Sequence, residues 1–136
     1  MIKLLENVKN VEEYNKLFDD VGWSSYDRKV SKLALENSLY TVSIYDDDKI
    51  VGFGRLIGDG VCYFYIHDVM VLPSYQKKGI GTMIIDKLKN KVLEYKKINP
   101  YLRLYLGPSL GKEEFYKKCG FITREEAGLG SGMILK

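Results

Sequence analysis

Two glycines one residue apart, Gly79 and Gly81, stand between an apolar stretch and a helical pattern. The N–H groups in the first turn of a helix have no partner inside the helix, and the helix dipole gives them partial positive charge. Glycine lets the backbone approach a ligand because it has no Cβ atom. Lys77 and Lys78 add charge next to the turn. The residue types around these glycines therefore predict a site for phosphate oxygens.

Two common phosphate-binding motifs fit this loop poorly. A Walker motif needs a lysine between the last glycine and the hydroxyl residue, but Thr82 follows Gly81 directly. The dinucleotide fingerprint needs a third glycine at position 84, which is Ile84, and a parallel βαβ unit. Glycines spaced this way also occur in tight connections, so the loop alone does not identify the ligand.

Hydrophobic periodicity predicts one mixed α/β domain over residues 1–136, with helices on the faces of a sheet. Glycines at 52 and 54 suggest a bend within a strand. Helices are expected at 11–21, at 27–37, from about residue 80 to Asn99-Pro100 and at 112–119. Strands are expected at 2–5, 40–45, 50–57, 61–72, 101–106 and 133–135.

The strand that precedes the loop carries two candidate proton acceptors, His67 and Asp68. Strict alternation puts residues 65, 67, 69 and 71 on one face and 66, 68 and 70 on the other. A bulge would change this assignment. An imidazole suits a general base because it titrates near neutral pH. The alternative is that His67 is a hydrogen-bonded sheet residue and Asp68 a structural anchor.

Composition excludes several classes of protein. A net charge of +3 gives no basic patch for nucleic acid, and no apolar run approaches the length of a membrane span. Two distant cysteines and one histidine argue against a zinc site, so no metal is expected. The N-terminal segment does not resemble a signal peptide, and we expect a cytoplasmic protein.

The string Q-x-x-G-x-G from Gln76 to Gly81, preceded by Val71-Leu72-Pro73, resembles the acetyl-CoA pyrophosphate motif of the GNAT N-acetyltransferase superfamily. A second string, Phe115–Phe121, resembles the family's F-Y-x-x-x-G-F segment. The resemblance covers residues 40–136 well and the first two helices loosely. It implies a mostly antiparallel sheet of six to seven strands with about four helices, splayed between the fourth and fifth strands.

The resemblance implies transfer of an acetyl group from acetyl-CoA to a primary amine of a small molecule or peptide by direct attack. A non-catalytic acetyl-CoA sensor or interaction module is the alternative, and a homodimer is compatible with either. Backbone groups near Val69 or Met70 would polarise the carbonyl group. The cofactor-binding residues carried over are Val69, Met70, Val71, Gln76, Lys77, Lys78, Gly79, Ile80, Gly81, Thr82, Ser109 and Tyr116.

The same resemblance assigns the catalytic and substrate residues. Tyr116 matches the family tyrosine that protonates the leaving thiolate, although a packing tyrosine is the plain structural reading. His67 or Asp68 would accept the proton of the amine. Substrate specificity in the family comes from the first two helices and their surroundings, and here this predicts Trp23, Tyr26 and Tyr65 as pocket residues.

Overall fold

A computed structural model describes all residues, 1–136, and they divide into two compact units, Met1–Tyr105 and Leu106–Lys136. Element order follows the prediction closely up to the fifth strand. The strands are β1 (Ile2–Glu6), β2 (Tyr40–Asp46), β3 (Lys49–Gly58), β4 (Tyr63–Val71) and β5 (Arg103–Leu106). The helices are α1 (Val11–Asp20), α2 (Arg28–Glu36), the 3-10 helix η1 (Pro73–Tyr75), α3 (Ile80–Tyr95) and α4 (Glu113–Lys118).

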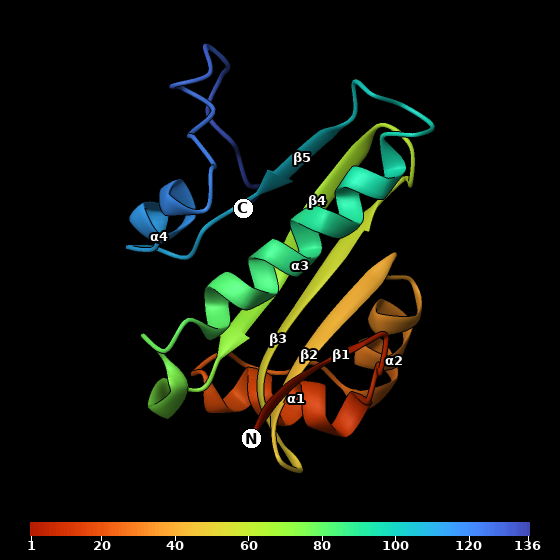
Figure 1. The fold of residues 1–136 in the computed structure, drawn as a ribbon, viewed down its shortest axis with the longest axis vertical. Coiled ribbons are helices and arrows are strands. Elements are labelled where there is room, and N and C mark those ends of the chain that lie inside the picture. Colours follow the sequence, from red (N-terminus) through yellow and green to blue (C-terminus); the bar gives the residue numbers. More distant parts are fainter. The chain divides into compact units, whose positions relative to one another are not determined.

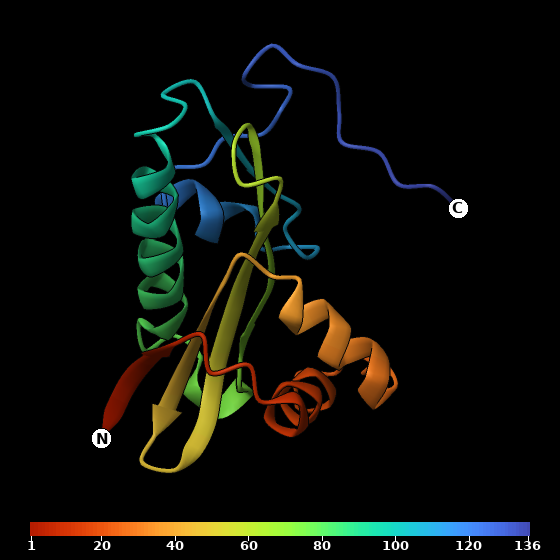
Figure 2. The same cartoon turned by 90° about the vertical axis from the view of Figure 1, so that its right-hand side faces the viewer.

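The five strands form one sheet in the order β1-β2-β3-β4-β5. The first three neighbouring pairs are antiparallel, and β5 runs beside β4 in the same direction, which makes the sheet mixed (Figure 1). Helix α3 covers one face, while α1 and α2 cover the other (Figure 2). Strand β2 is buried from Tyr40 to Tyr45 because helices lie on both of its sides.

Helices α1 and α3 are each positioned by an apolar stripe. In α1, Asn10 caps the first turn by accepting a hydrogen bond from the Glu13 N–H at 3.0 Å. The buried residues of α1 are Val11, Tyr14, Leu17 and Phe18, and those of α3 are Ile80, Ile84, Ile85, Leu88 and Val92. Both sets recur at spacings of three and four residues, as an amphipathic helix requires.

Gly52 and Gly54, where a bend was predicted, lie at a site of close packing under α3. A Cβ atom on Gly52 would lie 3.0 Å from Cγ2 of Ile80, and one on Gly54 would lie 2.6 Å from Cγ2 of Ile84. Both glycines therefore let α3 approach the sheet. The strand also changes register here, between Phe53 and Arg55.

The expected count of six to seven strands is wrong, because the sheet has five. The predicted strand at 133–135 does not form. Met133 and Leu135 are 97% and 98% exposed, so no neighbour buries the side chains that suggested a strand. Three nearby glycines, Gly128, Gly130 and Gly132, also weaken strand formation, because glycine loses the most backbone freedom when it is ordered.

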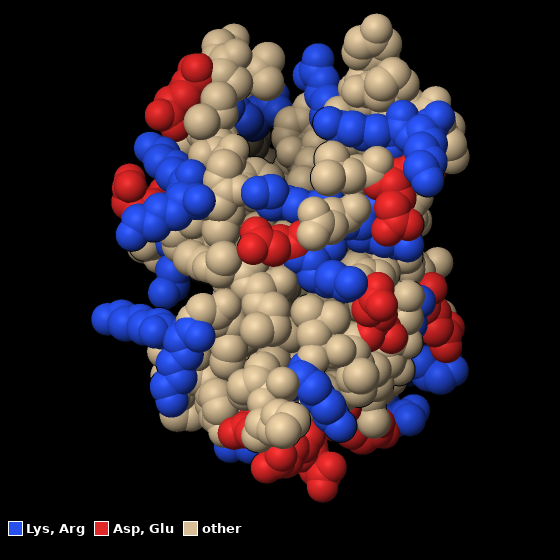
Figure 3. Space-filling view, viewed as in Figure 1, with Lys and Arg blue, Asp and Glu red and all other residues tan.

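Charged side chains are mixed on the surface. On the face drawn in Figure 3, Lys and Arg are interspersed with Asp and Glu and do not merge into one large basic area. Several lysines pair with nearby carboxylates, for example Lys16 with Asp20 at 2.7 Å and Lys32 with Glu36 at 2.9 Å. No helix is long and apolar enough to pass through a lipid bilayer.

Candidate acyl-transfer site

The predicted phosphate loop has the backbone conformation that an anion site needs. Lys77 and Gly79 are left-handed, with φ of 62° and 82°, and Gly79 is the N-cap of α3. The first hydrogen bond inside α3 runs from the Met83 N–H to the Gly79 carbonyl at 3.0 Å. The N–H groups of residues 80–82 therefore have no acceptor within the helix and carry the positive end of a 16-residue dipole.

Gln76 fastens this loop to the strand before it. Its side-chain Nε2 donates to the carbonyl oxygen of Val71 at 3.1 Å. The side chains of Gln76, Lys77 and Lys78 are exposed, and Lys78 Nζ lies 5.3 Å from the centre of the Tyr75 ring. The Tyr75 hydroxyl in turn donates to Asp46 at 2.6 Å. The loop is thus held from both sides while its amides stay available.

Strand β4 contains a β-bulge at the candidate catalytic residues. His67 pairs with Arg55 and Met70 with Phe53, so Asp68 and Val69 together oppose the single residue Gly54. Asp68 is the irregular residue, with a left-handed φ of 54°.

The bulge corrects the expected alternation of faces along β4. Before it, His67 shares a face with Arg55, on the side of α1 and α2. After it, Met70 takes that side together with its partner Phe53, while Val69 turns toward α3, 3.7 Å from the position of a Gly54 Cβ atom. Residues 65, 67, 69 and 71 therefore do not share one face. The side chain of Asp68 points to the α1 side, because it bonds to Tyr14 there.

No strand of the sheet lies beside the second half of β4. The Arg103 N–H donates to the Cys62 carbonyl at 2.8 Å, and the Tyr105 ring stacks on Tyr65 with centroids 5.2 Å apart. Strand β5 ends at Leu106, one residue later, and is the last strand of the sheet. It therefore does not run beside residues 67–71, and no other strand of the sheet pairs with that side of β4.

His67 and Tyr65 are both exposed, with ring centroids 6.1 Å apart. The Tyr105 ring, which stacks on Tyr65, is a third aromatic ring beside them, and nothing in the sequence pointed to it beyond its place in the fifth strand. The carboxylate of Asp68, in contrast, already has hydrogen-bond partners within the protein. Its Oδ2 accepts hydrogen bonds from Tyr14 Oη at 2.6 Å and from Arg55 Nε at 2.7 Å. Neither partner was predicted from the sequence, although a charged arginine inside an apolar strand was a usable signal.

The predicted substrate residues Trp23 and Tyr26 lie in the connection between α1 and α2. Both rings contact Phe18, with centroid distances of 5.1 Å and 6.1 Å. Trp23 is 37% exposed and Tyr26 is 60% exposed. They are thus anchored to the core on one side and accessible on the other, as recognition residues would be.

Tyr116 and Ser109 belong to the second unit. Tyr116 lies in α4, half-buried, and its ring makes edge-to-face contacts with Phe115 and Phe121. Burial, and to a smaller degree Cys119, raises the pKa of the Tyr116 hydroxyl to about 12. The side chain therefore stays a hydrogen-bond donor throughout the neutral range. Ser109 is exposed, and its carbonyl accepts the Lys112 N–H at 3.0 Å.

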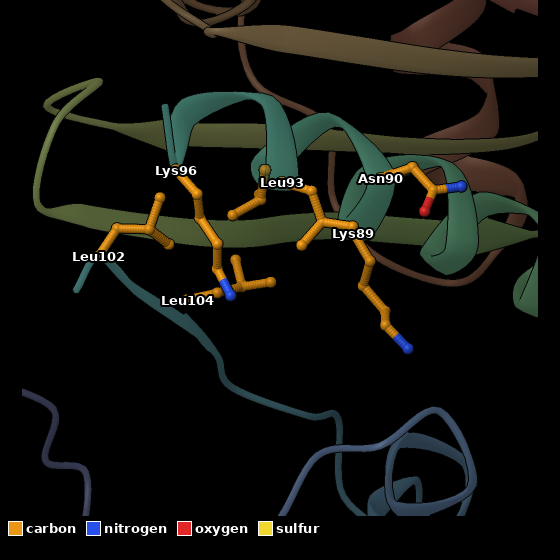
Figure 4. A pocket seen from close by; sticks show the side chains of 7 residues that line it. Lys89, Asn90, Leu93, Lys96, Leu102 and Leu104 are labelled. Atoms are coloured by element: carbon orange, nitrogen blue, oxygen red, sulfur yellow. The ribbon is translucent and has the colours of Figure 1, made fainter. Parts of the chain in front are cut away.

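A hollow of about 320 Å³ lies elsewhere, between the second half of α3 and β5 (Figure 4). None of the predicted site residues lines it. It begins nine residues after the start of α3, which corresponds to about 14 Å along a helix. Its walls are Lys89, Asn90, Val92, Leu93, Lys96, Leu102 and Leu104.

Comparisons with known proteins agree with this geometry. Residues 37–123 match the acetyltransferase (GNAT) domain family. The chain is 36% identical to an uncharacterized N-acetyltransferase, ycf52, of Gracilaria tenuistipitata over 118 residues, which cover 84% of this chain and 63% of the relative. It is 32% identical to the chloroplastic GCN5-related N-acetyltransferase 1 of Arabidopsis thaliana, covering 93% of this chain and 64% of the relative. The chain thus spans less than two thirds of the length of these two relatives.

Solved structures show the same fold. A GNAT-family acetyltransferase of Streptococcus pneumoniae superimposes with a TM-score of 0.81 and 29% identity, over 100% of this chain and 98% of the other. A Staphylococcus aureus protein described as a probable acetyltransferase superimposes with a TM-score of 0.87 and 31% identity, over 100% and 99%. With the loop, the bulge and the free strand edge in place, the chain belongs to the GNAT acetyltransferase family.

Proposed function

We propose that the chain is an acetyl-CoA-dependent N-acetyltransferase that acetylates a primary amine of a small molecule or peptide by direct attack. The observation that carries the proposal is the left-handed turn at Lys77 and Gly79, which leads into three free amides at the start of α3. When bound, acetyl-CoA supplies an activated acetyl thioester. The backbone amides of Ile80, Gly81 and Thr82 fit its diphosphate, and Lys77 and Lys78 add charge.

The free edge of β4 fits the remaining length of such a ligand. Val69 and Val71 offer backbone groups to an extended amide-containing chain, in the way that an added strand would use them. Near Val69 or Met70, a backbone N–H is the candidate donor to the oxygen that becomes negative during transfer. These groups belong to the sheet, so little reorganisation is needed when charge develops.

Two side chains are proposed to move or hold protons. His67 is exposed at the bulge and accepts the proton that the amine loses, directly or through water. Tyr116 donates a hydrogen bond to the departing sulfur. Because the pKa of Tyr116 is raised to about 12, its main contribution is stabilisation of the thiolate, and full transfer of its proton is uphill.

The alternative, an acetyl-CoA sensor without turnover, is less well supported. A sensor needs the loop and the strand edge but has no use for an exposed imidazole at the bulge. We also retain two proposals from the sequence. The two units act as one domain, which the family match across residues 37–123 supports. The protein is cytoplasmic, which the thiols of Cys62 and Cys119, neither of them in a disulfide, support.

The experiment that tests the function has two stages. Calorimetry with acetyl-CoA first measures binding to the purified chain. A panel of spermidine, glucosamine, phenethylamine and a short peptide with a free N-terminus then tests turnover by release of free thiol. Binding with turnover supports the enzyme, binding without turnover on any amine supports the sensor, and no binding at millimolar acetyl-CoA would refute both.

A further inference from the structure

Arg55, Asp68 and Tyr14 form a polar cluster between the sheet and helix α1 that the proposed chemistry does not use. Asp68 Oδ2 accepts both hydrogen bonds, from Tyr14 Oη at 2.6 Å and from Arg55 Nε at 2.7 Å. The side chains of Arg55 and Asp68 are only 17% and 15% exposed, and Tyr14 is 2% exposed. A charged pair that is this well shielded from water has a defined geometry, because few other hydrogen-bond partners are within reach of either side chain.

The cluster joins four elements at one point. Arg55 comes from β3, Asp68 from β4 and Tyr14 from α1. The Nη1 atom of Arg55 also approaches the carbonyl of Ala34 at 3.4 Å and Ser38 Oγ at 3.3 Å, at the end of α2. The two helices joined by the segment that contains Trp23 and Tyr26 are therefore connected through side chains to the bulge in β4.

Asp68 is the residue whose backbone makes the bulge. A φ of 54° is unfavourable for a residue other than glycine, although Asp and Asn tolerate it best. The hydrogen bonds to Tyr14 and Arg55 hold its side chain on the α1 side and offset this cost. If Asp68 returned to an extended conformation, the pairing after it would shift by one residue, and the faces of Val69 and Met70 would be exchanged.

We propose that Arg55, Asp68 and Tyr14 are positioning residues for acyl transfer, which hold the β4 bulge so that His67 stays exposed and the backbone of Val69 and Met70 keeps its orientation. The inference rests on the proposed function. It assigns Asp68 a role through the backbone, in place of the role of general base that the sequence left open. A misplacement of about 1 Å in a reactive group can cost on the order of a hundredfold in rate, so such a cluster has a large effect without touching substrate.

The first test compares Asp68→Asn, Asp68→Gly and Tyr14→Phe with the parent, using acetyl-CoA and the best amine of the panel. Asp68→Asn keeps the size of the side chain and its tolerance of positive φ, but it removes the charge that pairs with Arg55. We expect kcat to fall by roughly tenfold to a hundredfold, while the KM for acetyl-CoA changes by less than about threefold because the loop at 76–82 is intact. Tyr14→Phe, which removes one hydrogen bond, should lower kcat by a smaller factor.

The pH profile separates positioning from proton transfer. In Asp68→Asn, the dependence of kcat on pH should keep its shape at a lower plateau. In the comparator His67→Gln, the decline at acidic pH should disappear, because that side chain is the proposed base. If Asp68→Asn itself loses the acidic decline, Asp68 is the base and the proposal is wrong. A parent-like kcat in Asp68→Asn or in Asp68→Gly would also overturn it.

A second readout needs no activity. Amide hydrogen exchange, followed by NMR without ligands, reports the order of residues 66–71. We expect exchange at those amides of residues 66–71 that pair with β3 to be faster by roughly tenfold in Asp68→Asn, and unchanged in Tyr101→Phe, a substitution at a ring that is 87% exposed. Unchanged exchange in Asp68→Asn contradicts the proposal. Absence of turnover in the parent instead refutes the proposed function, and the exchange data still decide whether the cluster holds the bulge.

Discussion

Gly54 of β3 lies beneath Ile84 of α3, so close that a Cβ atom on the glycine would stand 2.6 Å from Cγ2 of the isoleucine. The isoleucine cannot easily give way, because it is 0% exposed. The same missing Cβ atom would also lie 3.1 Å from Cδ1 of Leu88. The distance between α3 and the sheet, and with it the position of the loop at residues 76–79, therefore depends on the absence of one methyl group.

We predict that Gly54→Ala lowers the free energy of unfolding by about 1–3 kcal/mol, as overpacking of a tight core does. Urea unfolding measures the change as a lower transition midpoint with a similar slope. Gly130→Ala is the matched control, since no atom lies within 4 Å of its Cβ position and its φ is not left-handed. Equal losses in the two variants would show that the contact with Ile84 is unimportant.

The free amides at the start of α3 can be tested by removing one of them. Proline is tolerated in the first turn of a helix, because the N–H it lacks has no partner there. We expect Gly81→Pro to weaken acetyl-CoA binding by roughly tenfold, with Gly81→Ala, which keeps the N–H, as the reference. Calorimetry measures both, and circular dichroism verifies that α3 is retained. Identical affinities for the two variants would exclude this amide from the diphosphate site.

Tyr116→Phe removes a hydroxyl and keeps the ring that packs against Phe115 and Phe121. We expect kcat to fall by an order of magnitude or more, in the range of a lost transition-state donor, with acetyl-CoA affinity nearly unchanged. The raised pKa of Tyr116, about 12, adds a second expectation. Rates should show no decline from ionisation of this tyrosine between pH 7 and pH 9. A parent-like rate in the variant would remove Tyr116 from the mechanism.

Three buried tyrosines predict sensitivity to alkaline pH. Burial first, and then a hydrogen bond to a carboxylate, raises the pKa of each above its ordinary value of 10. Between pH 10 and the folded-state pKa, the unfolded chain has lost the proton while the folded chain keeps it, so stability falls as pH rises. The pairs are Tyr14 with Asp68, Tyr40 with Glu6 and Tyr45 with Glu13, at 2.6, 2.5 and 2.6 Å.

The urea midpoint should therefore be lower at pH 10.5 than at pH 8, and Tyr45→Phe should reduce that difference. Tyr101→Phe, at a ring that is 87% exposed, should leave the difference as it is in the parent. A urea midpoint that is higher at pH 10.5 than at pH 8 would contradict the expected loss of stability.

Much of the fold could be predicted from periodicity alone. The stripe of α3, with Ile80, Ile84 and Leu88 all buried, reflects a pattern that local sequence carries in full. The strand expected at 133–135 does not form, because strand formation depends on contacts that local sequence does not carry. Three consecutive apolar residues suggest a strand, but a strand is stable only when it pairs with another strand. No local pattern specifies which strand that would be.

The site was predictable in its loop and less so in its strand. Gly79 and Gly81 mark the turn, because positive φ and close approach leave few other choices of residue. The bulge at Asp68 carries no such mark, since its conformation is stabilised by Tyr14, 54 positions away in the sequence, and by Arg55. Strict alternation therefore assigned Val69 to the wrong face.

The free outer edge at residues 67–71 also bears on the behaviour of the chain in storage and during expression. Unpaired backbone groups accept any extended peptide, and not only the ligand whose shape they fit. Without a ligand at this edge, the protein offers a template on which a second copy or an unfolded neighbour can add a strand and start an aggregate. If the proposed function holds, preparations supplemented with coenzyme A should remain clear for longer at high concentration, because the bound ligand would cover this edge.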